Sequence, residues 1–247
     1  MILAYAGVAI FAVVSLVIGV RLLLLWRRTR KLPELLIGLS FLFEGLLTNI
    51  LNALQKFVHH FPPWMERPIQ IGVVVTACGA AVCLAIGAWK VFRPREAWAR
   101  GLVIACVAAL TAYSIDSAFP HQGVYGPRNL AWWWVAIFCR AGAHAWMGLE
   151  AFLYQRTMQR RVRLGLGDPV VADRMWLWSL AGAATTVLWL VAGVARTVGG
   201  AAGLQHPLTL EVIALMGFVA SITNWLVFMP PQAYVRRVER RAAAAAA

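Results

Sequence analysis

Long apolar stretches separated by short polar segments dominate the chain. A helix that crosses a bilayer needs about 20 mostly apolar residues, and seven such stretches occur, each closed by charged residues, proline or glycine. The pattern predicts an all-α membrane protein in which residues 1–235 form a seven-transmembrane helix bundle and residues 236–247 form a basic, alanine-rich tail. The predicted helices are residues 2–25, 35–54, 69–89, 101–119, 130–153, 175–195 and 208–229.

The basic residues between these stretches fall on alternate sides of the predicted membrane. The loops after the first, third and fifth helices and the tail together carry seventeen Lys and Arg, whereas the other loops carry four. Because Lys and Arg accumulate in cytoplasmic loops, the N-terminus is predicted to lie outside and the C-terminus in the cytoplasm. We expect a multi-pass protein of the cell membrane, specifically a bacterial inner membrane. The four residues on the opposite side are Lys56, Arg67, Arg128 and Arg196.

Composition supports the membrane assignment and argues against a nucleic-acid-binding protein. The chain has 247 residues, of which 61% are hydrophobic and 13% charged, and its formal net charge is +13. A charge of this size is typical of nucleic-acid-binding proteins, but these arginines stand in short clusters between apolar stretches. The sequence therefore indicates the lipid bilayer, and no nucleic acid, as the partner.

Ionisable and strongly polar residues within the predicted helices are the main candidates for function, because such side chains are costly in hydrocarbon. Glu44 lies near the middle of the second helix, and Thr48, Asn52 and Gln55 follow on the same face at helical spacing. This stripe predicts a ligand or proton pathway that opens to the outside. The alternative is that the amides and Thr48 only form hydrogen bonds between helices.

The fifth helix carries Arg140 and His144, one turn apart. Counted at 1.5 Å per residue from the inner end of each predicted helix, Glu44 and His144 lie at the same depth in the membrane. We therefore expect Glu44 to contact Arg140 and His144 in a buried cluster. Asn224 of the seventh helix is assigned to the same pathway. Glu150 lies nearer the cytoplasmic end of the fifth helix and is expected to pair with arginines at the interface.

A second set of polar residues is predicted at the outer rim. Asp116 ends the fourth helix and Glu211 begins the seventh. Several histidines lie in outer loops or at helix ends, but no spacing places two metal ligands on one helical face. We therefore predict solvated rim residues and no metal site. The histidines are His59, His60, His121 and His206.

Three functions are compatible with this pattern. The first is a receptor or sensor that binds a small molecule or lipid in an outward-facing polar pocket and docks a cytoplasmic partner on the loop from Arg156 to Arg174 or on the tail. The second is a small-solute or proton-coupled transporter, and the third is an intramembrane metal-dependent hydrolase. No catalytic set is identified and no cofactor is predicted.

Rhodopsins share the topology, but retinal needs a lysine within a helix, and the lysines here lie at helix ends: Lys31, Lys56 and Lys90.

Overall fold

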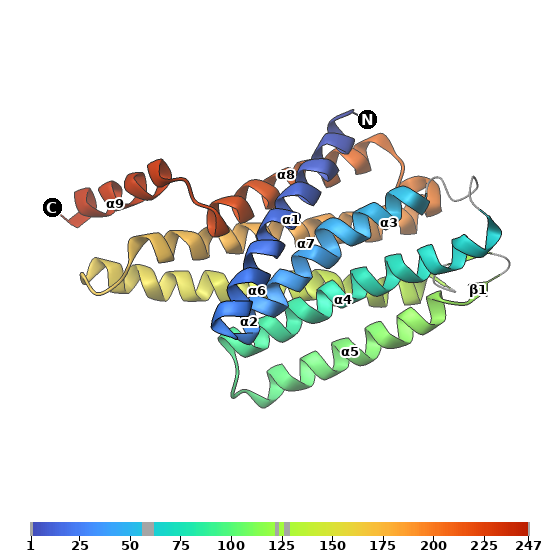
Figure 1. Cartoon of the computed structure of the whole chain (residues 1–247), viewed down its shortest axis with the longest axis horizontal. Helices are drawn as coiled ribbons and strands as arrows, with labels where there is room; N and C mark the ends of the chain where they lie inside the picture. Colours follow the sequence, from blue (N-terminus) through green and yellow to red (C-terminus); the bar gives the residue numbers. More distant parts are fainter. Residues whose placement is uncertain (1, 56–61, 122–123, 126–128, 247) are drawn as a thin grey trace.

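The computed structural model describes residues 2–55, 62–121, 124–125 and 129–246, which are almost entirely helical (Figure 1). In the connection between α5 and α6, two short strands, β1 and β2, pair antiparallel. The elements are α1 (Ile2–Thr29), α2 (Leu32–Ser40), the π-helix η1 (Phe41–Leu47), α3 (Thr48–Gln55), the 3₁₀-helix η3 (Pro63–Met65), α4 (Glu66–Phe92), α5 (Ala97–Ser117), β1 (Pro120–His121), β2 (Val124–Tyr125), α6 (Leu130–Arg163), α7 (Pro169–Gly203), α8 (Pro207–Phe228) and α9 (Gln232–Ala246).

Six helical segments of the described chain are both long and apolar enough to cross a membrane. The helix α6 contains another of the stretches predicted from sequence and, with 34 residues, is longer than each of the six. It is less apolar, because Arg140, His144 and three successive tryptophans interrupt it. The structure is thus that of a helical multi-pass membrane protein with six apolar candidate spans, and the predicted count of seven depends on α6. The six segments are Ala6–Thr29, Leu32–Gln55, Glu66–Phe92, Ala97–Ser117, Pro169–Gly200 and Pro207–Phe228.

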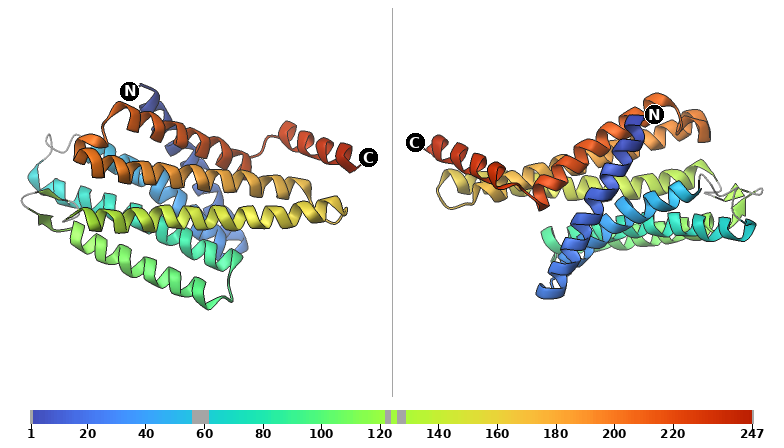
Figure 2. Two further views of the ribbon diagram at one scale, coloured as in Figure 1. Left: turned by 180° about the vertical axis from the view of Figure 1, so that it is seen from behind. Right: turned by 45° about the horizontal axis from the view of Figure 1, so that its top comes forward.

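The helices pack as a closed bundle. Contacts join α1 to α2 and α8, α4 to α2, α3, α5 and α6, and α7 to α6 and α8. Most helices run along the long axis, whereas α1 crosses the bundle at a steep angle (Figure 2). The turns α1–α2, α4–α5 and α6–α7 and the helix α9 all lie at one end (Figure 1), which we call the basic end because these segments carry most of the arginines.

Local sequence signals set several helix boundaries. The side chain of Asn129 accepts a hydrogen bond of 3.1 Å from the Trp132 amide at the start of α6. Asp168 caps α7 in the same way, through a bond of 2.8 Å from the Val170 amide. The helix α8 ends before two prolines, and Arg21 donates to the carbonyl of Phe228 at 2.9 Å. A cation is favourable at this end of a helix dipole, so Arg21 ties α1 to the terminus of α8.

The tail that the sequence shows as basic and alanine-rich is helical through most of its length. In α9, Tyr234 and Val238 are half-buried and one turn apart, whereas the arginines are exposed. The hydroxyl of Tyr234 donates a hydrogen bond to the carboxylate of Asp173 on α7. This contact holds α9 against the bundle at the basic end.

Candidate functional site

Glu44 lies in the π-helix η1, between the regular helices α2 and α3. The amide of Thr48 donates to the carbonyl of Phe43, five residues earlier, and the Thr48 hydroxyl donates to the same carbonyl at 2.8 Å. The Asn49 side chain donates to the carbonyls of Glu44 and Gly45 at 3.2 and 2.8 Å. Single π-helical turns within longer helices are frequent at functional sites. The polar side chains after Glu44 therefore serve first to satisfy the backbone of this turn.

Close packing of α1 fixes the position of the turn. A Cβ atom on Gly45 would overlap the side chain of Ser15, which is fully buried in α1. Only glycine lets the two backbones approach this closely. The glycine next to Glu44 is thus explained by the steep crossing of α1 over η1.

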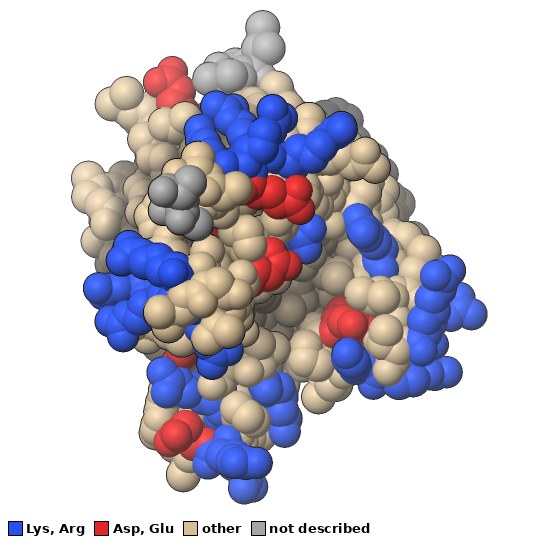
Figure 3. Space-filling view, turned by 90° about the vertical axis from the view of Figure 1, so that its left-hand side faces the viewer, with Lys and Arg blue, Asp and Glu red and all other residues tan. Residues whose placement is uncertain are grey.

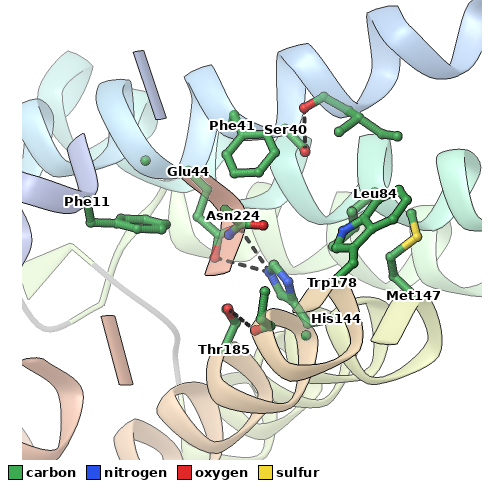
Figure 4. A pocket seen from close by; sticks show the side chains of 14 residues that line it. Phe11, Ser40, Phe41, Glu44, Leu84, His144, Met147, Trp178, Thr185 and Asn224 are labelled. Atoms are coloured by element: carbon green, nitrogen blue, oxygen red, sulfur yellow. Dashed lines mark hydrogen bonds and ion pairs between the residues drawn. The ribbon is translucent and has the colours of Figure 1, made fainter. Parts of the chain in front are cut away.

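The Glu44 carboxylate contacts the two helices α6 and α7, and Figure 4 shows its contact with His144 of α6. The Nε2 atom of His144 on α6 lies 3.0 Å from Oε2 and 3.3 Å from Oε1 of Glu44. The indole N–H of Trp189 on α7 donates to Oε1 at 3.1 Å. The side chains of Glu44 and His144 are 16% and 15% exposed. Three helical segments therefore meet at one buried carboxylate.

Two glycines bring α6 and α7 close enough for this arrangement. A Cβ atom on Gly182 would lie 2.8 Å from the Cα of Gly148 and 2.8 Å from the carbonyl oxygen of His144. Small residues at such crossings allow close approach of membrane helices. The hydroxyl of Thr186 also reaches the Ala141 carbonyl of α6 at 3.4 Å. The pair thus presents His144 and Trp189 side by side to Glu44.

Arg140 does not form the ion pair with Glu44 that we expected from sequence. Its guanidinium lies over the Trp189 ring, with Cζ 5.0 Å from the ring centre, and donates to the Cys78 sulfur at 3.5 Å. A second ring, that of Tyr113, lies 5.8 Å away. Within the described chain the Nε atom of Arg140 has no hydrogen-bond partner. Trp189 thus contacts both groups: its ring lies under the Arg140 guanidinium and its N–H donates to Glu44.

Glu44, Thr48 and Asn52 of the predicted stripe line one cavity in the structure, whereas Gln55 is not among its lining residues. The Thr48 hydroxyl lies 2.8 Å from that of Thr76, and the Gln55 side chain donates to Gln70; both partners belong to α4. The stripe therefore both lines the cavity with Glu44 and bonds to α4 through Thr48 and Gln55.

Two cavities meet at Glu44. The first, the Asn52 cavity, has a volume of about 140 Å³ and extends away from the basic end. The second, the Ser40 cavity, measures about 40 Å³ and extends toward the basic end. Phe11, Glu44 and Thr185 line both. The Asn52 cavity is also lined by Thr48, Asn49, Asn52, Trp189 and Gly217, and the Ser40 cavity by Ser40, His144, Met147, Trp178 and Asn224.

The remaining residues predicted from sequence lie elsewhere or complete this site. Asn224 is buried on α8 and lines the Ser40 cavity. Asp116 is half-buried in the last turn of α5, and Glu211 is exposed on the second turn of α8; neither is among the residues that line the two cavities. Among the described residues, no group of three or more His, Cys, Asp or Glu could hold a metal ion. His206 is exposed at the start of α8 and His121 belongs to β1, whereas His59, His60, Lys56 and Arg128 lie outside the described residues.

Some residues of the site were not identified from sequence. Trp189 lies in the predicted helix of residues 175–195, but the sequence does not show that its N–H group points to Glu44. Asn49, Ser40 and Thr185 are polar residues within apolar stretches, which is the only sequence signal they give. To assign these three residues to the site, one must know which faces of three helices point toward one another.

A second carboxylate with a cation and an indole lies closer to the basic end. Oε1 of Glu150 on α6 accepts from Nε of Arg93 at 2.8 Å and from the indole of Trp146 at 3.3 Å. The predicted pairing of Glu150 with an interfacial arginine is thus confirmed. The bond and the charge of Glu150 raise the pKa of Arg93, which follows the end of α4. The side chain of Glu150 is 9% exposed, whereas that of Arg93 is 38% exposed.

Comparison of the chain with protein-family models, curated proteins and solved structures finds no match. The class of the protein is therefore defined by its fold and site alone: a helical multi-pass membrane protein with a buried carboxylate at the junction of two cavities.

Proposed function

We propose that the protein is a receptor or sensor that binds a small molecule in the Asn52 cavity, with Glu44 as the anchoring group. The observation that carries this proposal is the position of a buried carboxylate in the wall of that cavity. A carboxylate has about four lone-pair positions, of which His144 and Trp189 use only part. The Glu44 carboxylate can therefore still accept a hydrogen bond from an amine or hydroxyl group of a ligand.

The size and lining of the cavity define the ligand class. A cavity of roughly 150 Å³ holds a molecule the size of benzene, and the Asn52 cavity is close to this at about 140 Å³. Its wall combines apolar groups, such as Leu188 and Ile213, with Thr48 and two asparagines. We expect a small molecule with an apolar body and a hydrogen-bond-donating head group.

Binding at Glu44 has a route to the rest of the bundle. A donor from the ligand competes with His144 and Trp189 for the carboxylate and so changes the contacts that join η1 to α6 and α7. Both helices continue to the basic end, where the loop from Arg156 to Arg174 and α9 are the proposed docking surface for a partner. A π-turn that can return to regular α-helix is a suitable two-state element for such a change.

A proton-coupled transporter is the second candidate, and the Ser40 cavity favours it. This cavity has room for a few water molecules at most and lies on the other side of the Glu44–His144 pair. Its polar groups, Ser40, Thr185 and Asn224, are suitable hydrogen-bond partners for such water. A carboxylate and a histidine between two cavities are the components of a proton relay. For the third alternative, the metal-dependent hydrolase, the described residues offer no ligand group.

The topology is part of the proposal. We propose seven spans, with α6 as an interior span, the N-terminus outside and the basic end in the cytoplasm of a bacterial cell. Single cysteines in a background without native cysteines test it at Trp64, Phe119 and Leu166, which are 72%, 54% and 77% exposed. An impermeant thiol reagent on intact cells is expected to label positions 64 and 119 but not 166. Equal labelling of 119 and 166 would show that α6 does not span.

Native mass spectrometry of protein extracted directly from its membrane tests the binding function. Wild-type protein is expected to carry a bound small molecule that Glu44→Gln loses and that Glu211→Gln, which changes an exposed carboxylate on α8, retains. Retention by Glu44→Gln would contradict the proposal. Uptake of that molecule into proteoliposomes under a proton gradient would favour the transporter over the receptor.

A further inference from the structure

A large cleft opens at the basic end, independent of the Glu44 site. Its volume is about 840 Å³, and it lies between the ends of α6 and α7 and the helix α9. Three arginines line it, Arg156, Arg163 and Arg241, together with Gln155 and Gln159. We call it the basic cleft.

The charge of the basic cleft is not balanced by its acidic residue. Asp173 is the one carboxylate among the lining residues, and it accepts a hydrogen bond from Tyr234. Across the described chain, no salt bridge involves Arg156, Arg163 or Arg241. Figure 3 views this end of the molecule and shows many Lys and Arg side chains spread around it, with Asp and Glu side chains scattered among them. The cleft therefore attracts an anion.

A buried amide gives an independent indication of a ligand. Gln155 is only 6% exposed and lines the cleft. No hydrogen bond to its side chain is found in the part of the chain that the structure describes. Its amide is not among the fully enclosed unpartnered polar atoms of the described chain, so the small exposed part of this side chain opens to the cleft and is available to bond a polar group there.

The apolar part of the wall distinguishes a lipid from a soluble anion. Phe152, Trp176 and Val238 lie beside the arginines, and Trp176 is 45% exposed. The candidate span in α7 begins at Pro169, which also lines the cleft. The cleft is thus at the level where lipid head groups meet the end of the span, and tryptophan prefers this region.

We infer that the basic cleft binds the phosphate head group of an anionic phospholipid. Arginine forks bind phosphate oxygens through paired hydrogen bonds, and Gln155 donates from the buried side. The acyl chains leave along Phe152 and Trp176 toward the bilayer. Since α9 contributes Val238 and Arg241, the bound lipid fastens α9 to α6 and α7.

Lipid retention in native mass spectrometry tests this inference. The full-length protein is reconstituted into nanodiscs with equal amounts of phosphatidylcholine and phosphatidic acid, and the fraction that carries each lipid is measured after release. Wild-type protein is expected to retain phosphatidic acid preferentially. Arg156→Gln with Arg163→Gln is expected to reduce this fraction at least about tenfold, and Gln155→Leu about fivefold.

The matched control changes two other arginines of the same end, Arg95→Gln with Arg100→Gln, which are exposed near the α4–α5 turn. This variant removes the same charge and is expected to retain phosphatidic acid as the wild type does. An equal loss in both variants would mean general attraction to the basic end and would overturn the specific cleft. Millimolar inorganic phosphate is expected not to displace the lipid; displacement would identify a soluble phosphate as the ligand and overturn the lipid assignment.

Discussion

Glu44 and Glu150 have similar partners but different surroundings. Each carboxylate accepts from one cationic or titratable side chain and from one indole: His144 and Trp189 for Glu44, Arg93 and Trp146 for Glu150. Glu150 is in the regular helix α6, and its partner Arg93 is permanently charged and partly exposed. Glu44 is in a π-turn, lines two cavities and faces a histidine.

The difference shows how one set of contacts serves two roles. The Arg93–Glu150 bond joins the end of α4 to α6, and the charge of Arg93 is permanent. A carboxylate that shares its bonds with a histidine at the wall of a cavity can exchange partners with a ligand or a proton. We therefore regard the Glu150 group as structural and the Glu44 group as functional.

The largest effect is expected from separating Glu44 and His144. Among the described residues, His144→Leu leaves the carboxylate with Trp189 as its one remaining side-chain donor in a buried site, where removal of one partner costs up to about 3 to 5 kcal/mol. The double variant Glu44→Gln with His144→Leu should recover most of the thermal stability in detergent, because the unpaired group is gone. Additive losses in the double variant would show that the two side chains are not coupled.

A smaller effect is expected from the turn that carries Glu44. Gly45→Ala places a methyl group on Ser15, and overpacking of this kind costs about 1 to 3 kcal/mol. The exchange Gly45→Ala with Ser15→Gly should restore part of the loss. Gly142→Ala is the matched control on α6, since a Cβ atom there meets nothing within 4 Å. Equal melting temperatures of Gly45→Ala and Gly142→Ala would contradict the close approach of α1 and η1 at Gly45.

The smallest effect is expected at the Glu150 group. Arg93 is 38% exposed, so water screens its interaction with Glu150 and a coupling of about 1 kcal/mol is expected for such a pair. The cycle of Arg93→Gln and Glu150→Gln, measured by thermal unfolding, gives this coupling. A value larger than that between Glu44 and His144 would reverse the comparison.

The sequence predicts the helices better than the site. Each of the seven apolar stretches predicted from sequence overlaps a helical segment of the structure, because burial in lipid requires long apolar runs, whereas the helix α9 in the polar tail was not predicted. Depth counting also placed Glu44 level with His144. It could not place Arg140, since the aromatic faces of Trp189 and Tyr113 that hold it come from other helices.

The π-turn that carries Glu44 was not predictable from sequence for a similar reason. An ideal period of 3.6 residues per turn assumes a regular helix, and Phe41–Leu47 departs from it. This turn depends on Gly45 meeting Ser15, two residues 30 positions apart in sequence. Such a contact leaves no periodic signal.

Thermal shift with a panel of small amines and alcohols that carry one apolar ring tests the central claim most directly. The same panel is applied to wild-type protein, Glu44→Gln and Glu150→Gln in detergent, so that each compound is compared across the two carboxylates. The account predicts that compounds which raise the melting temperature of the wild type also do so for Glu150→Gln but not for Glu44→Gln. Equal stabilisation of Glu44→Gln would contradict it, because Glu44 would then not be the anchoring group.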